Sequence, residues 1–273
     1  MNKPRVSILA GLLCSVLGLM ALQAQEPNIQ WSHSRGLVDS SFVLALKTDP
    51  PGGLIRYTTD GSSPSLDRGE IYTVPLMIDK TTVLRALTSD EAGNTKIETR
   101  SFLFVDQVKD QEAFPQGFVS EVVSRRRGPN RPHTFDWAMD REVLDDVENN
   151  GELAEHLKAL PSLSVVLELQ DLQFMFENQS RCGVEYERPV SLELIYPEDE
   201  AYADFDGFQI DCGIRMQGGA GGQARKKSFR ILFKKDCGNG SLNYPLFESA
   251  IHFAGTAASK FEGVVLRAGG NTN

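Results

Sequence analysis

Residues 213–235, GIRMQGGAGGQARKKSFRILFKK, decide how the C-terminal half of this chain is interpreted, because two apolar strands flank a glycine-rich loop. Loop positions without side chains let backbone N–H groups approach and surround an anion, and cations follow the loop directly. These glycines and cations are Gly218, Gly219, Gly221, Gly222, Lys226, Lys227 and Arg230. The pattern predicts a β-hairpin whose loop is either a phosphate site or a flexible surface turn.

Alternation along the strand that follows the loop separates these cations. The apolar positions 229, 231 and 233 are expected to face the core, and Lys227 shares their side. Lys226 and Arg230 point to the other face, so they are the predicted phosphate contacts.

Five blocks around this hairpin occur in the same order as in a known family. They are YERPVSLELIYPE (186–198), GFQIDCGIRMQGGA (207–220), KKSFRILFK (226–234), LNYPLF (242–247) and VVLRAGGN (264–271). Residues 160–273 thereby resemble the front half of the spore-coat protein H (CotH) kinase family, with Tyr186 where tryptophan is more usual. The resemblance implies an atypical secreted kinase that uses ATP and Mg²⁺ to phosphorylate a serine of a protein substrate. The cofactor-binding residues that it implies are Gly218, Gly219, Lys226, Lys227 and Arg230.

Phosphoryl transfer also needs carboxylates that hold magnesium and orient the acceptor. The CotH family places them in a Trp-Asp-x-Asp type motif, well after the strand that ends here in LRAGGN (266–271). The catalytic residues are therefore expected beyond Asn273, no metal site is predicted within the chain, and the chain is expected to be an inactive fragment. The competing hypothesis is a non-catalytic secreted or cell-surface protein, structural or carbohydrate-associated, with a cell-surface polysaccharide as its partner.

The N-terminal residues 1–24 are typical of a signal peptide. Lys3 and Arg5 precede an apolar run at 8–22, and Ala24 offers a small residue at the cleavage site. We therefore expect a secreted, periplasmic or cell-surface protein without a membrane span after cleavage. The formal net charge of −9 argues against nucleic acid as the partner.

Residues 27–106 have the alternation of short strands separated by turn-forming stretches, which predicts an Ig-like β-sandwich. IRYTTDGSSPS (55–65), Tyr72, Pro75 and TTVLRAL (81–87) resemble the sandwich at the C-terminus of chitobiases and β-hexosaminidases, an accessory module of many surface proteins. Asp60 is interpreted as the start of a turn rather than as a catalytic acid or a calcium ligand. The candidates for sugar stacking, which alternation places in the core as readily, are Trp31, Tyr57 and Tyr72.

Residues 107–160 are predicted to be a linker with short helices, in which Asp140 caps the first helix and the basic stretch 124–132 is an exposed loop. Residues 161–273 are predicted to be the β-rich front part of an α+β kinase-like domain, truncated, with strands at 164–169 and 190–196. The acidic stretch 197–207 is interpreted as a turn in preference to a calcium site. Cys212 and Cys237 flank the glycine loop, and either a bridge between them or unpaired buried thiols fits the sequence.

Overall fold

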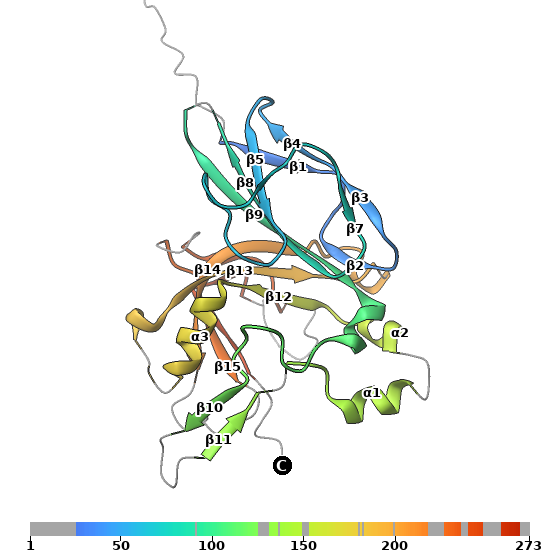
Figure 1. Ribbon diagram of the computed structural model, residues 1–273, viewed down its shortest axis with the longest axis vertical. Coiled ribbons are helices and arrows are strands. Elements are labelled where there is room, and N and C mark those ends of the chain that lie inside the picture. The colour runs from blue at the N-terminus through green and yellow to red at the C-terminus, as the bar shows by residue number, and fades with distance from the viewer. Residues whose placement is uncertain are drawn as a thin grey trace, which may run out of the picture.

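The computed structural model describes residues 26–90, 92–124, 131–135, 137–148, 153–179, 181, 183–198, 200–217, 227–235, 240–247 and 258–267. The chain is mainly β, and two five-stranded sheets dominate it (Figure 1). Each sheet supports its own hydrophobic core. The predicted signal peptide lies outside the described residues.

The first nine strands form a sandwich-like unit, called the N-terminal sandwich below. Its main sheet has the order β2-β9-β8-β5-β6, and the pairs β1-β4 and β3-β7 form two smaller ladders. Leu44, Leu84 and Phe102 are fully buried at its centre, as the alternating pattern predicted. The strands are β1 (Asn28–Trp31), β2 (Gly36–Val38), β3 (Phe42–Leu44), β4 (Leu46–Asp49), β5 (Leu54–Thr58), β6 (Glu70–Ile71), β7 (Leu76–Ile78), β8 (Thr82–Ser89) and β9 (Thr95–Phe104).

The segment after the sandwich contains helices, as predicted, and one hairpin that was not predicted. The elements are η1 (Val105–Asp110), β10 (Glu121–Ser124), β11 (Arg131–Thr134), α1 (Arg141–Glu148) and α2 (Leu153–Lys158). Asp140 caps α1, because its Oδ1 accepts a hydrogen bond from the N–H of Glu142 at 3.0 Å. The basic stretch 124–132 is not wholly a loop: Ser124 pairs with Arg131 at the end of the β10-β11 ladder, so ladder hydrogen bonds extend into it.

The second five-stranded sheet, called the second sheet below, is antiparallel throughout, with the order β12-β13-β14-β15-β18. The predicted hairpin on either side of the glycine loop is confirmed as the pair β14-β15. The elements are β12 (Ser162–Val166), α3 (Leu169–Glu177), η2 (Val184–Tyr186), β13 (Arg188–Ile195), η3 (Glu200–Tyr202), β14 (Phe208–Gln217), β15 (Ser228–Leu232), β16 (Leu242–Asn243), β17 (Lys260–Phe261) and β18 (Gly263–Leu266).

Helix α3 corrects the prediction of a buried strand at 164–169. The strand β12 ends at Val166, and the extended backbone of Glu168 leads into the helix. Leu172, Met175 and Phe176 lie at helical spacing and are buried against one face of the second sheet. This amphipathic stripe makes the segment a helix, because it covers apolar side chains of β13 and β14.

The opposite face of the second sheet is polar, and the N-terminal sandwich lies against it. Residues alternate along β13 between apolar Val190 and Leu192, which belong to the core under α3, and Ser191 and Glu193, which are also fully buried. Strand β9 contacts β13 and β14 on this polar side. The two units therefore meet through polar side chains rather than through a shared hydrophobic core.

Candidate functional site

The predicted phosphate hairpin is only partly within the described residues. Gly218, Gly219 and Lys226 lie outside them. The ammonium of Lys227 lies 4.7 Å from the centroid of the Phe135 ring, on the core side that alternation predicted. Burial lowers the pKa of Lys227. Arg230 is exposed on β15, so the two described cations occupy opposite faces.

Arg230 lines a cleft of about 850 Å³ beside the paired strands β15 and β18, called the basic cleft below. Its other cationic lining residues are Lys234, Lys235 and Lys260, and Glu262 is the acidic one. The ammonium of Lys234 is already engaged, since it donates to Glu187 Oε2 at 2.6 Å. The basic cleft can attract an anion through the remaining cations.

The three aromatic residues that were candidates for sugar stacking are built into the N-terminal sandwich. Each is partly buried and packs against its hydrophobic core. The Trp31 indole N–H donates to Glu98 at 3.0 Å, and the Tyr72 hydroxyl accepts from the Leu46 N–H at 3.0 Å. For Tyr57, burial and a hydrogen bond to Glu70 raise the pKa to about 12. These contacts show that the three rings help to hold the sandwich together and do not form a flat face for stacking sugars.

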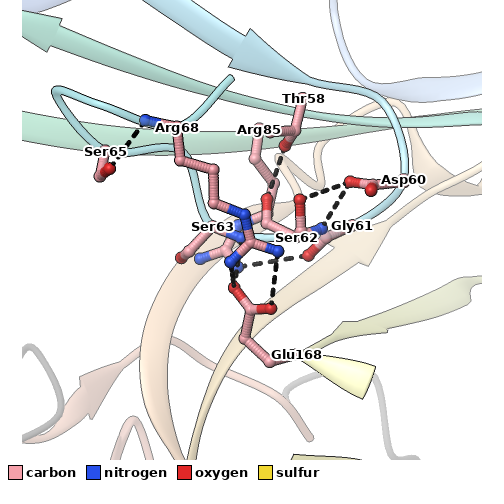
Figure 2. A network of polar contacts seen from close by, with 9 residues as sticks. All are labelled: Thr58, Asp60, Gly61, Ser62, Ser63, Ser65, Arg68, Arg85 and Glu168. Atoms are coloured by element: carbon pink, nitrogen blue, oxygen red, sulfur yellow. Dashed lines mark hydrogen bonds and ion pairs between the residues drawn. The ribbon is translucent and has the colours of Figure 1, made fainter. Parts of the chain in front are cut away.

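The turn that begins at Asp60 contacts the second unit (Figure 2). Asp60 Oδ1 accepts hydrogen bonds from the N–H and the hydroxyl of Ser62, and these bonds lower the pKa of Asp60. Gly61 has φ +79°, a backbone conformation that glycine adopts without strain. The interpretation of Asp60 as a turn residue is therefore confirmed.

Glu168 holds this turn from the opposite side (Figure 2). Its Oε1 accepts from the Ser63 N–H at 2.6 Å, and the Arg68 guanidinium donates to both carboxylate oxygens at 3.1 and 3.3 Å. Because the guanidinium bonds to both oxygens, this bidentate contact fixes the orientation of the Glu168 carboxylate as well as its distance from Arg68. Glu168 is the N-cap residue of α3, but its side chain makes no capping hydrogen bond, because its carboxylate is committed to the sandwich.

A buried carboxylate marks the centre of the contact between the two units. Glu193 of β13 is fully buried, and its Oε2 accepts from the Ser101 hydroxyl of β9 at 2.6 Å. Arg35 Nε lies 3.4 Å from its Oε1, and Ser164 of β12 bonds to Ser101 at 2.7 Å. Desolvation raises the pKa of Glu193, although Ser101 and Arg35 act in the opposite direction. These four residues are called the polar interface below.

Beside the polar interface, the two units form an open pocket of about 650 Å³, called the junction pocket below. The second unit supplies Tyr196, Tyr202 and Phe205, whose rings lie 5.3 to 6.3 Å apart. The sandwich supplies Arg35 and Arg100. Half-buried rings beside charged side chains give the pocket both apolar and polar walls.

Arg100 is held in place by the sandwich. Its Nη1 donates to the His33 carbonyl at 2.7 Å, and its guanidinium lies 4.8 Å from the centroid of the Trp31 ring. Burial lowers the pKa of Arg100, and the nearby Arg35 charge adds to this effect. The side chain is therefore fixed before any ligand arrives.

The family model of the Chitobiase/beta-hexosaminidase C-terminal domain matches residues 34–100. No curated protein and no solved structure matches the chain. The matched segment runs from just before β2 into β9. This chitobiase-type domain therefore carries Arg35, Arg68 and Arg100, as well as the turn at Asp60. These are the three arginines of the sandwich that face the second unit in the contacts described above.

Sequence reasoning missed the residues that join the units. Glu168 was placed inside a strand, and the aromatic residues at 196–205 were overlooked in favour of the acidic ones. A signal for Glu193 was present, because a carboxylate between Leu192 and Leu194 interrupts an apolar strand. The acidic stretch itself contains η3, and among the described residues no group of three His, Cys, Asp or Glu side chains is placed to hold a metal ion.

Two further sequence predictions concern the membrane and the cysteines. Within the ranges described above, none of the helices has the length and apolar character needed to cross a bilayer. Cys212 is fully buried in the core under α3. Cys182 and Cys237 lie outside the described residues, so both alternatives, a bridge from Cys212 to Cys237 and unpaired thiols, stay predictions.

Proposed function

We propose that this chain is a non-catalytic, exported, carbohydrate-associated protein of the cell surface. The observation that supports it is the match of residues 34–100 to the chitobiase-type domain, an accessory module in the enzymes that give it its name. The docking of that domain onto a second sheet through Glu168 and Glu193 supports a fixed two-unit binding protein.

Retention on insoluble polysaccharides tests this function. The purified chain is mixed with chitin, cellulose or peptidoglycan, and the bound fraction is measured as the salt concentration rises. We expect retention on at least one polymer that persists at high salt, since stacking and neutral hydrogen bonds are little screened. Absence of retention on all three polymers at low salt would contradict the proposal.

A second candidate function is nucleotide binding by a CotH-like kinase, of which this chain would carry the front part. The basic cleft supports it, because Arg230, a predicted phosphate contact, lines this cleft with three lysines. The cofactors in this proposal are ATP and Mg²⁺, and the phosphate acceptor is a serine of a protein.

A melting experiment separates this candidate from the first. ATP with Mg²⁺ should raise the melting temperature if the chain binds nucleotide, since a ligand at 100 times its Kd stabilises the folded state by about 2.7 kcal/mol. Arg230→Ala should remove the increase, whereas Lys47→Ala, which removes an exposed cation of the sandwich, should retain it. An unchanged melting temperature of the unmodified chain would contradict the nucleotide proposal and would not affect the carbohydrate proposal.

A further inference from the structure

The junction pocket has the composition of a saccharide site. Tyr196 and Phe205 stack with their centroids 5.3 Å apart and their planes 30° apart, and Tyr202 lies beside both. All three rings are half-buried, so each keeps part of its surface at the pocket wall. Together the three rings form an aromatic platform. A sugar ring can stack its apolar C–H face on this platform and carries hydroxyls at its edge.

The segment that carries the platform is held in place by contacts with neighbouring parts of the second unit. Gly207 lies so close to β13 that an added Cβ would stand 2.0 Å from the Leu194 carbonyl oxygen. The Tyr202 hydroxyl donates to the Ala159 carbonyl at 3.3 Å, and the Tyr244 hydroxyl donates to the Asp206 carbonyl at 2.7 Å. A ligand therefore meets a wall that needs little ordering on binding.

The charges that line the pocket select against a charged polymer. Arg35 and Arg100 of the sandwich bring hydrogen-bond donors to the pocket, while the second unit places exposed carboxylates at its rim. These carboxylates are Glu198, Glu200 and Asp206. A polyanion would face the carboxylates and a polycation would face the arginines, whereas a neutral hydroxyl both accepts from arginine and donates to carboxylate.

We infer that the junction pocket binds a segment of an uncharged oligosaccharide, with its ring on the Tyr196, Tyr202 and Phe205 platform and its hydroxyls between the arginines and the rim carboxylates. This inference rests on the proposed carbohydrate-associated function and places its site. An open pocket of about 650 Å³ has the size of ordinary ligand sites and accommodates a short segment of a glycan chain. Because each unit supplies one wall, the site exists only when the two units are docked.

Calorimetric titration of the purified chain tests the inference with three tetrasaccharide probes. Two are neutral, the tetramers of N-acetylglucosamine and of glucose, and the third is the acidic tetramer of galacturonate. We expect at least one neutral probe to bind and the acidic probe to bind at least about tenfold more weakly, because each 1.4 kcal/mol of repulsion is a factor of ten in Kd.

Two variants locate the site, and one variant serves as the control. Phe205→Ala removes part of the platform and should weaken binding about tenfold, the order expected for loss of one aromatic contact. Ala203→Trp places bulk at an exposed position of the pocket lining without removing a packed side chain, so it should block binding even if Phe205→Ala folds poorly. Phe114→Ala removes an exposed ring outside the pocket lining and should leave Kd unchanged.

The outcomes separate this inference from the proposed function. If a neutral probe binds the unmodified chain, Phe205→Ala and Ala203→Trp equally well, the site lies elsewhere and only the inference is overturned. Tighter binding of the galacturonate tetramer overturns the charge argument. If polymers retain the chain but no tetrasaccharide binds, the junction pocket is not the site, and if neither binds, the proposed function fails as well.

Discussion

At the scale of the residue, Glu193 is the side chain whose chemistry departs most from what its sequence context implies. It lies in an apolar strand, yet it is fully buried at a polar contact, with Ser101 and Arg35 as partners. Desolvation raises its pKa, and the same cause raises the pKa of Asp211 on the neighbouring strand β14. One fully buried and one half-buried carboxylate therefore resist ionisation at the surface where the units meet.

This shift predicts an unusual pH dependence of stability for the unmodified chain. A carboxyl whose pKa is higher in the folded state contributes stability that is fully present below its ordinary value of 4.5 and is lost as pH rises through the raised value. Glu193→Gln keeps the shape without a group that must ionise, so at pH 8 its free energy of unfolding should exceed that of the unmodified chain by roughly 1 kcal/mol. Chemical denaturation between pH 5 and pH 8 measures the difference, which should shrink toward pH 5.

The difference between the unmodified chain and the Glu193→Gln variant reports the ionisation of Glu193 alone, because Asp211 is present in both. Glu142→Gln removes an exposed carboxylate of α1 and should leave the pH profile unchanged. If the Glu193→Gln variant is less stable than the unmodified chain at pH 8 and equally stable at pH 5, the Arg35 ion pair outweighs desolvation, and the sign of the shift is wrong.

At the scale of the element, period-2 patterns were read correctly where one face of a strand is apolar. The runs that became β8, β9, β14 and β15 have this property, and the orientation of Lys227 followed from it. Prediction failed at α3, because the apolar run 163–169 crosses the boundary between β12 and the helix and shows no period of its own. It also failed at β10-β11, where each strand has only four residues and β11 is polar and contains a proline.

Helix α3 is expected to be essential for the core of the second sheet. Phe176 is 2% exposed, and its ring contacts Phe135 at a centroid distance of 4.7 Å and Trp137 at 5.5 Å. Phe176→Ala should lower the free energy of unfolding by about 3–5 kcal/mol, the range for a large aromatic side chain removed from a core. Gln170→Ala, at an exposed position of the same helix, should change it by less than about 0.5 kcal/mol. Equal effects of the two variants in urea denaturation would show that α3 does not hold this core.

At the scale of the whole molecule, two hydrophobic cores are joined by contacts that could not be predicted from the sequence. Glu168 lies roughly a hundred residues from its partners in the turn at Asp60, and Glu193 lies similarly far from Ser101. Nothing in the local pattern of either segment indicates its partner, because hydrogen-bonding side chains carry no periodic signal. The junction pocket was missed for the same reason, since its walls come from units whose arrangement depends on these contacts.

If these contacts hold the units rigidly, the units should unfold together. We expect the unmodified chain to show a single heat-absorption peak in differential scanning calorimetry, since coupling across a buried polar contact makes two cores one cooperative unit. Ser101→Phe places a bulky ring where the Ser101 side chain is fully buried against β13, so it should separate the units and split the peak in two. Thr95→Phe makes the same change at an exposed position of β9 and should preserve one peak. Two peaks from the unmodified chain would mean that the sandwich and the second sheet melt independently, and a saccharide site that depends on both walls would then lose its rigid frame.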